Sequence, residues 1–319
     1  MALLNRDIDF MSPRKRRLTG TLSTIFIVIA LLSLAINRLQ LGLDFTSGTL
    51  IELGYEGSVN PSEISAMLQE EGYEEATVVT FGSDSDVLIR LPIDEEEGEM
   101  AAGAAVSLGD EILDLVRERS DMAVEMRRSE YVGPSVGAEL AERGGLALLV
   151  ALGIVLMYVA MRFQFKFAVG SVVALMHDVV IVLGVISLFR LTFDLTVLAA
   201  LLALIGYSLN DTIVVFDRVR ENFRIMRTDN VEEIVNTSLN QVLSRTVVTS
   251  LTTLLALFSM LIFGGETIRG FAITLIVGVA TGTYTSLHIS SNIVMALKIQ
   301  KEDLMVPVKE GANDDGSMV

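Results

Sequence analysis

Long apolar windows dominate the pattern of hydrophobic and polar positions in this chain. A run of about 20 apolar residues crosses the hydrocarbon core of a bilayer as a helix. Six windows approach or exceed that length, which predicts six membrane-spanning helices. They are Leu18–Ile36, Gly144–Met161, Phe167–Phe189, Leu195–Phe216, Thr246–Phe263 and Phe271–Leu297. The last window is longer than the hydrocarbon core, so we expect it to tilt or protrude.

The first window has two interpretations, because the basic run Arg14–Arg17 precedes it. Such a run also begins a secretory signal peptide. However, the apolar stretch Leu18–Ile36 is long for a signal peptide, and Ala35-Ile36-Asn37 is a poor cleavage site. We therefore favour an uncleaved membrane anchor.

Between the first two windows the pattern is that of a small α+β domain. Asn60-Pro61-Ser62-Glu63 is a typical helix start, with a capping Asn and Pro at the first helical position. This helix should end at Gly72, and a second should run from about Ala101 to Arg119. Short β-branched or aliphatic runs predict four strands: Thr49–Leu53, Ala76–Phe81, Val87–Leu91 and Ala123–Val132. A polar turn, Gly82–Asp86, should join the middle two. The order β-α-β-β-α-β predicts a ferredoxin-like domain.

Charge separates this domain from the rest of the chain. Residues 37–143 hold 7 Lys/Arg and 24 Asp/Glu, whereas all 319 residues hold 24 and 40, for a net charge of −16. The remainder is therefore nearly neutral, which excludes a single soluble globule. Without a basic stripe, nucleic-acid binding is not expected. We interpret the acidic runs Glu70–Glu75 and Asp94–Glu99 as solvated surface, with a metal or cationic partner as the alternative.

Lys and Arg in the short loops predict the orientation. One side of the membrane carries Arg6, Arg14–Arg17, Arg162, Lys166, Arg218, Arg220, Arg224, Arg227, Lys298 and Lys301. The short loops of the other side carry only Arg190 and Arg269. Both termini should therefore be cytoplasmic and the acidic domain outside. The expected segments are a cytoplasmic start (1–17), helix one (18–36), the acidic domain with its linker (37–143), helices two to six (144–297) and a cytoplasmic tail (298–319).

Glycine and proline punctuate the end of the acidic domain. The segment Tyr131–Gly137 contains Gly133 and Pro134 directly before the second window. It is either a plain linker or a hinge that lets the domain swing.

The sequence offers little for metal, cofactor or covalent chemistry. It contains no Cys, and its two His residues are His177 and His288, so disulfides, thiolate sites and multi-histidine zinc sites are excluded. We find neither a phosphate-binding loop nor a catalytic constellation, and expect no cofactor, no metal and no enzymatic activity.

Polar groups inside the predicted membrane helices are the candidate functional residues. A charged side chain at the bilayer centre costs about 2.5–3.5 kcal/mol on insertion scales, so its presence indicates a function. His177 and Asp178 lie near the middle of the third helix. The fourth carries Asn210, Asp211 and Thr212. Because Ser208, Asp211 and Thr212 have i, i+3, i+4 spacing, they should share one face, turned away from lipid.

Asp211 and Arg245 form a candidate pair across helices four and five. Both should lie near the cytoplasmic face at similar depth, where pairing would share the cost of desolvation. Simpler interpretations stay open. Arg245 is also explained as one more positive residue on the cytoplasmic side. Asp211 is also explained as a helix cap or as a structural group, and His177 as a hydrogen-bond partner of Asp178.

The sixth window carries a stripe of small residues with a spacing of four. Its members are Thr274, Gly278, Gly282, Ser286 and Ser290. Small residues let helix backbones approach closely, so this stripe predicts a helix-packing seam within the bundle or with a partner.

Several motifs together resemble the SecD/SecF family of Sec translocase subunits. Leu41–Thr49 resembles its D-F-x-G-G-T signature, and the long string Gly206–Arg218 is the most specific match. Val132-Gly133-Pro134, His177-Asp178 and Phe263-Gly264-Gly265 also fit, so the resemblance covers essentially the whole chain. Ser47 stands where the family has the first Gly of its pair. If that position needs a positive φ, serine is strained there.

The resemblance implies a place in the resistance–nodulation–division superfamily and in the bacterial inner membrane. It implies a periplasmic ferredoxin-like domain and a six-helix half that forms a heterodimer with SecD. The further partners it implies are SecYEG, YajC, membrane lipid and unfolded preprotein, whose export the ion-motive force assists. By match to the family's motif, Asp211 and Arg245 occupy positions implicated in ion coupling.

The mechanism we expect is a charge switch. A deprotonated Asp211 pairs with Arg245, and entry of a proton or cation breaks the pair and shifts the two helices. This motion swings the acidic domain through Gly133 and Pro134, while Asn210 and Ser208 hold a water or a sodium ion. The alternative function is a superfamily exporter of small molecules or lipids, although the acidic domain leaves little room for a substrate cleft. A scaffold without transport would leave the buried acids unexplained.

Overall fold

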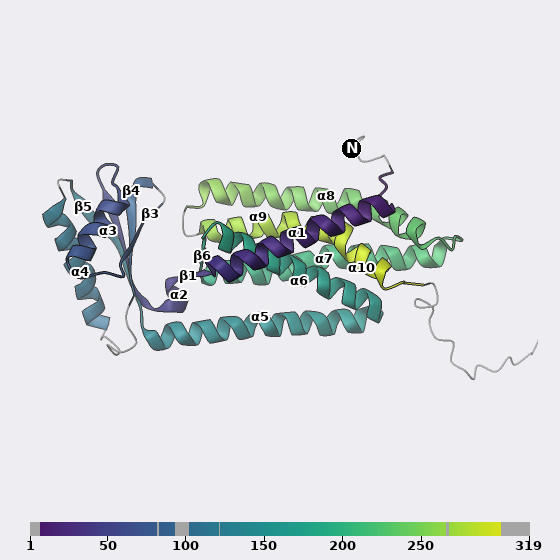
Figure 1. Cartoon of the computed structure of the whole chain (residues 1–319), viewed down its shortest axis with the longest axis horizontal. Helices are drawn as coiled ribbons and strands as arrows, with labels where there is room; N and C mark the ends of the chain where they lie inside the picture. The colour runs from purple at the N-terminus through teal and green to yellow at the C-terminus, as the bar shows by residue number, and fades with distance from the viewer. Residues whose placement is uncertain (1–6, 82, 93–101, 121, 266–267, 301–319) are drawn as a thin grey trace, which may run out of the picture.

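The chain forms a long helical bundle with a small sheet domain at one end (Figure 1). The structure is a computed structural model, and it describes residues 7–81, 83–92, 102–120, 122–265 and 268–300. Within these ranges, six helical spans are long and apolar enough to cross a membrane, as predicted. Their helices are α1 (Pro13–Asn37), α5 (Pro134–Arg162), α6 (Phe165–Leu188), α7 (Leu195–Ile225), α8 (Val231–Phe263) and a sixth span from Arg269 to Ala296.

Several helices extend beyond the apolar windows that predicted them. Helix α1 begins at Pro13, within the basic segment, and α8 begins at Val231 instead of Thr246. Polar caps fix the starts of α7 and α8, of which only the start of α8 lies outside the predicted window. The Asp194 carboxylate accepts a hydrogen bond from the Val197 amide at the start of α7, and Asn230 accepts one from the Glu232 amide at the start of α8. The α7–α8 turn lies at the end of the bundle remote from the sheet (Figure 1).

The sixth span is not one regular helix, which the sequence did not predict. Helix α9 (Arg269–Tyr284) passes into a π-helical turn, η4 (Thr285–Ile289), and then into α10 (Ser290–Ala296). A π turn inserts one extra residue and rotates the side chains that follow it, and such turns are frequent at functional sites.

Helix α1 is a full member of the bundle and packs along α6. A Cβ atom on Gly184 of α6 would lie 2.2 Å from the Cβ of Ala30, so the two backbones are in close contact. The Ser33 hydroxyl donates to the Ser187 hydroxyl at 3.0 Å farther along the same seam. Small residues therefore determine how near these helices lie.

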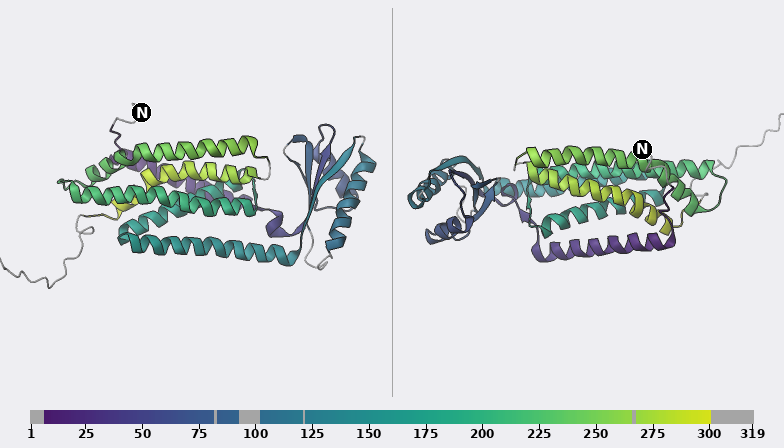
Figure 2. Two further views of the ribbon diagram at one scale, coloured as in Figure 1. Left: turned by 180° about the vertical axis from the view of Figure 1, so that it is seen from behind. Right: turned by 90° about the horizontal axis from the view of Figure 1, so that it is seen from above.

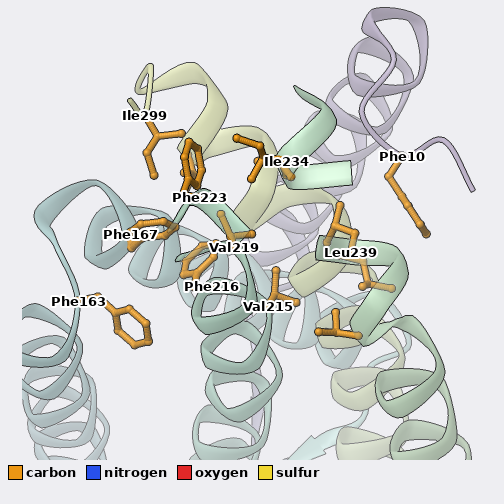
Figure 3. Close-up of a cluster of buried hydrophobic side chains, with 14 of the residues drawn as sticks. Phe10, Phe163, Phe167, Val215, Phe216, Val219, Phe223, Ile234, Leu239 and Ile299 are labelled. Atoms are coloured by element: carbon orange, nitrogen blue, oxygen red, sulfur yellow. The ribbon is translucent and has the colours of Figure 1, made fainter. Parts of the chain in front are cut away.

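An aromatic cluster joins the α5–α6 turn to α7 (Figure 3). The rings of Phe167 and Phe216 have centroids 4.9 Å apart, and Phe163 meets Phe216 edge-on at 6.5 Å. Phe223 belongs to the same core, about two turns beyond Phe216 on α7. This cluster fixes the end of the bundle that lies away from the sheet.

The small domain has the predicted order of strands and helices. Its elements are β2 (Gly48–Tyr55), α3 (Pro61–Glu70), β3 (Thr77–Phe81), β4 (Ser83–Leu91), α4 (Ala102–Arg119) and β5 (Val124–Val132). The strands form an antiparallel sheet in the order β3-β4-β2-β5. Buried side chains of Ile51, Ile89, Leu68 and Ile112 fill the core between the helices and the sheet.

Local signals in this domain behave largely as predicted. The Asn60 side chain accepts from the Ser62 amide at 3.1 Å to cap α3, and Gly72 has φ 100° just after its end. The predicted turn Gly82–Asp86 is wrong, because Ser83–Asp86 belong to β4 and the Ser83 hydroxyl bonds to Asp86. The acidic run Asp94–Glu99 and the tail from residue 301 lie outside the described residues.

Two connections join the domain to the bundle (Figure 2). One runs from α1 through β1 (Gln40–Leu41) and the short helix α2 (Leu43–Thr46) into β2. Strand β1 pairs in parallel with β6 (Thr192–Phe193), which lies between α6 and α7. The other connection passes directly from β5 into α5.

Candidate functional site

A fully buried carboxylate, Asp178 of α6, connects two helices inside the bundle. Its side chain is 0% exposed. The Ser208 hydroxyl of α7 donates to Asp178 Oδ2 at 2.5 Å, and Asp178 Oδ1 lies 3.3 Å from Nδ1 of His177. A charge that far from water is expensive, and no Lys or Arg pairs with Asp178 among the described residues. The carboxylate therefore depends on His177 and Ser208.

His177 extends this network to two further elements. Its Nε2 is hydrogen-bonded to the Ser23 hydroxyl of α1, and its Nδ1 lies 3.1 Å from the Thr285 hydroxyl at the start of η4. A neutral imidazole donates through one nitrogen and accepts through the other. Moving the proton on His177 therefore exchanges donor and acceptor roles with α1 and with the sixth span.

The small-residue stripe of the sixth span faces this network. A Cβ on Gly278 would come 2.6 Å from the Leu204 side chain of α7, and one on Gly282 would come 3.2 Å from Ser208 Oγ. Ser286 and Ser290 are both buried, and the Ser290 hydroxyl donates to the carbonyl of Ser286 at 2.7 Å. A Cβ on Gly282 would also lie 3.4 Å from Asp178 Oδ2, so the stripe leaves room for the hydrogen bond between Ser208 and Asp178.

Asp211 is the second buried acid among the described residues of the helical bundle, about one turn beyond Ser208 on α7. Ser208, Asp211 and Thr212 are all buried, as their spacing predicts. Asp211 Oδ2 is shielded from solvent and has no hydrogen-bond partner among the described residues. A buried carboxylate oxygen without a partner is unfavourable, and a bound proton or cation would relieve it.

Two neighbours of Asp211 on α7 and α8 are exposed, whereas Asp211 itself is buried. Arg245 of α8 is exposed and, although within electrostatic range, makes no ion pair with Asp211 within 4.0 Å in the described part of the chain. Asn210 is exposed, whereas Ser208 is buried, so the two do not form a common ligand site. Residues two apart on a helix point in nearly opposite directions, which explains the separation.

The segment Tyr131–Gly137, for which the sequence allows a plain linker or a hinge, belongs mostly to a strand and a helix in the structure. Tyr131 and Val132 end β5, α5 begins at Pro134, and Gly133 alone stands between strand and helix. The physical reason is the preference of proline for the first helical position, the same signal that begins α3 at Pro61. A hinge at Gly133 and Pro134 would therefore be a single joint.

Ser47 lies between α2 and β2, on the connection that enters the domain, and packs against the start of α5. A Cβ on Gly137 of α5 would come 3.0 Å from the Ser47 amide nitrogen. Ser47 has φ 60° and Gly48 has φ 126°, so both residues take backbone conformations that favour glycine. The two chain segments that enter and leave the domain thus pack on each other.

Arg90 fastens the domain to the α2 segment, which the sequence did not reveal. Its guanidinium donates to the Leu41 carbonyl at 2.7 Å and to the Thr46 hydroxyl. Burial lowers the pKa of Arg90, although arginine stays charged at neutral pH. The only signal in the sequence was a basic residue at the end of a strand in a strongly acidic block.

Two family models match the chain. Residues 112–300 match the C-terminal region of the protein export membrane proteins SecD and SecF. Residues 32–59, which include Ser47 and Gly48, match the SecD/SecF GG motif.

Curated relatives match over nearly the full chain. The protein translocase subunit SecF of Pseudomonas aeruginosa is 46% identical over 308 residues, which cover 97% of both chains. The SecF of Vibrio alginolyticus is 46% identical over 313 residues, covering 97% of this chain and 96% of that one. The SecF of Escherichia coli O157:H7 is 42% identical over 297 residues, covering 92% and 90%.

Solved structures of SecDF are similar as well. The crystal structure of SecDF, a translocon-associated membrane protein from Thermus thermophilus, matches with a TM-score of 0.82 and 37% identity. The match covers 93% of this chain and 40% of that one. SecDF in a super-membrane-facing form matches with a TM-score of 0.66 and 37% identity over 92% of this chain and 39% of that one. This chain thus spans less than half the length of SecDF.

Proposed function

The chain belongs to the SecF family, and we propose that it is an accessory subunit of the bacterial Sec protein-export machinery in the inner membrane. The relatives that match nearly its whole length are named as translocase subunits. They give no support to the alternative, an exporter of small molecules or lipids. Like those subunits, it would act on the passage of other proteins and catalyse no covalent reaction.

Its principal partner in this proposal is a SecD chain. SecDF matches this chain over 93% of its length but is much longer, so a second chain of the SecD type would supply the remainder. Helices α5 and α8 expose large apolar side chains, which would pack against such a second chain. Copurification of this chain with SecD tests the pairing. SecYEG and YajC are further proposed partners, and unfolded preprotein is the proposed substrate.

The sheet domain is proposed to be ferredoxin-like and periplasmic. Its strand order β3-β4-β2-β5, with a helix after the first and third strands, supports the fold assignment. The distribution of Lys and Arg supports the orientation. The helix ends remote from the sheet domain carry Arg14–Arg17, Arg162, Lys166, Arg218, Arg220, Arg224 and Arg227, whereas the short loops near it carry Arg190 and Arg269.

Ion coupling is proposed to reside in the acids inside the bundle. The observation that carries this proposal is the orphaned Oδ2 of Asp211, buried beside a hydrogen-bonded network centred on Asp178. Binding of a proton or small cation at Asp211 would remove a buried charge. Because Arg245 lies on the exposed side of α8, its pairing with Asp211 would belong to a second state of the helices.

The change at Asp211 would reach the sheet domain along α7. Strand β6 immediately precedes α7 and pairs with β1, whose Leu41 carbonyl is held by Arg90 of the domain. The two SecDF forms have the same identity to this chain, yet their TM-scores are 0.82 and 0.66. That difference supports a fold whose parts take more than one relative arrangement, and hence a joint at Gly133 and Pro134.

The test is export into vesicles driven by an ion gradient after ATP is exhausted. Asp211→Asn should lose the stimulation that this chain and SecD provide, because the side chain no longer changes charge. Asp217→Asn is the matched control, since Asp217 lies on the same helix but is exposed and pairs with Arg162 at 3.4 Å. Full stimulation with Asp211→Asn would refute the coupling role. Separate proton and sodium gradients would identify the ion.

A further inference from the structure

Two adjoining hollows lie beside α1. One has a volume of about 410 Å³ and lies between α1, α6 and the end of the sixth span. The other, about 350 Å³, lies at the start of α1. Both are lined by Gly20 and Asn292, so they adjoin each other. We call the two hollows together the α1 groove.

The body of the α1 groove is apolar. Its walls are the side chains of Ile27, Val173, Met176, Val180 and Ile293, which come from three helices. No side chain fills the space beside Gly20, since a Cβ placed there would have no atom within 4 Å among the described residues. The shape and lining suit a hydrocarbon chain.

The end of the α1 groove at the start of α1 is cationic and has unpaired polar groups. Arg17 is exposed and makes no hydrogen bond or ion pair with any described residue. Arg16 pairs with Glu232 through NH1 at 3.3 Å, but its Nε is buried without a partner. The Oδ1 of Asn292 is also buried without a partner in the described part of the chain, while its Nδ2 donates to Thr19.

We propose that the α1 groove binds one anionic phospholipid. Its phosphate would accept from Arg16 and Arg17, and a hydroxyl of a glycerol headgroup would donate to Asn292 Oδ1. One acyl chain would follow Ile27, Val173 and Ile293. Arg17 directly precedes the apolar window that begins at Leu18, which puts the guanidinium groups at the level of lipid phosphates.

This lipid would also cover part of the polar network described above. Ser23 and His177 both line the apolar hollow, and their hydrogen bond joins α1 to α6. An acyl chain lying over that bond excludes water from it and raises its strength. The proposal requires only that the chain spans a bilayer, so it stands independently of the proposed role in export.

The experiment is native mass spectrometry of the purified full chain with phosphatidylglycerol or phosphatidylcholine added to the detergent. The wild type should retain one phosphatidylglycerol in preference to phosphatidylcholine. Arg17→Gln should weaken retention about fivefold, the effect of one cationic residue at a lipid surface. Arg14→Gln is the matched control, because Arg14 has the same charge on the same helix end but does not line the α1 groove.

A steric variant tests the apolar part independently. Gly20→Leu should fill part of the α1 groove and abolish preferential retention, and its Cβ meets no described atom within 4 Å. Gly153→Leu on α5 is its control, because a Cβ there also has open space, away from the groove. Equal retention of both lipids by the wild type, or equal effects of each variant and its control, would overturn the proposal.

A photoreactive residue at Thr24, which lines the α1 groove, identifies the occupant in the complex with SecD. Crosslinking to phospholipid is expected. Crosslinking to a protein helix in place of lipid would contradict the proposal and assign the groove to a partner subunit.

Discussion

At the scale of single residues, Ser47 occupies a backbone conformation that favours glycine. Its φ is 60°, and non-glycine residues pay about 1–2 kcal/mol in this region. Ser47→Gly should therefore raise the free energy of unfolding by about 0.5–1 kcal/mol, after allowing for the greater flexibility of glycine in the unfolded chain. Thermal unfolding of the detergent-solubilised protein measures this change.

The neighbouring residue supplies a contrasting control. A Cβ on Gly48 would lie 2.3 Å from the Leu91 carbonyl oxygen, and Gly48 has φ 126°. Gly48→Ser should therefore destabilise the same junction. If both substitutions were neutral, backbone strain at this turn would not contribute to stability.

Tyr55 gives a pH-dependent prediction within the sheet domain. Its hydroxyl is buried without a partner among the described residues, and burial raises the pKa of Tyr55 from 10.0 to about 12. Above pH 10 the unfolded chain therefore loses this proton before the folded one. Protonated Tyr55 therefore leaves the stability of the folded domain unchanged below pH 10. Between pH 10 and about 12 the free energy of unfolding falls, because the unfolded chain ionises more readily.

Tyr55→Phe should remove that part of the alkaline destabilisation. At neutral pH it should be neutral or stabilising by up to about 1 kcal/mol, because an unpaired buried hydroxyl is lost. Resistance of the domain to proteolysis at pH 8 to 12 measures both effects. An unchanged pH profile would show that the hydroxyl ionises without unfolding the domain.

The candidate site shows what helical spacing can and cannot predict. It places Ser208, Asp211 and Thr212 on one inward face, since burial follows from the geometry of a single helix. It does not settle whether Arg245 reaches Asp211, because that depends on how α7 and α8 are rotated against each other. The contacts of His177 with Ser23 and Thr285 could not be predicted from helical spacing either, because they join three separate elements.

At the scale of elements, close contact between α1 and α6 depends on Gly184. A Cβ at this position would come 2.5 Å from Ala30 Cα, so the backbones must separate to accommodate it. Gly184→Ala should lower the free energy of unfolding by about 1–3 kcal/mol, the usual cost of overpacking. Gly153→Ala, in open space on α5, is the control in the same thermal-unfolding assay. Equal stability of the two variants would contradict close packing at Gly184.

The errors in the predicted elements have separate causes. Apolar windows report the thickness of the bilayer, whereas a helix continues until a cap or a breaker ends it, as at Asn230 and Pro134. The alternating Ser and Asp of residues 83–86 have the composition of a turn, yet pairing with the neighbouring strands extends β4 through them. The π turn η4 begins at Thr285, whose hydroxyl lies 3.1 Å from His177 Nδ1 of α6, and no local pattern in the sequence predicts it.

At the scale of the whole molecule, the two connections to the sheet domain offer a place to lock it. A Cβ on Gly137 would lie 3.5 Å from Ser47 Cβ, within the range of about 3.5–4.5 Å that a disulfide needs. The chain contains no Cys, so a pair made by Ser47→Cys and Gly137→Cys has no competitor. Oxidation should abolish stimulation of export, and reduction should restore it.

Each single-cysteine variant is the control for this lock, because it carries the same steric change without the bond. Export assays under oxidising and reducing conditions compare the three proteins. Unchanged stimulation in the oxidised double variant would show that the domain need not move at this joint.

The direct passage of β5 into α5 has a mechanical consequence. Helix α5 has 29 residues, which at about 1.5 Å per residue make a rod about 44 Å long. If its far end is held by the aromatic cluster, a tilt of about 10° displaces the end at Gly133 by about 8 Å. A movement of small angle within the membrane thus becomes a large linear stroke at the sheet domain.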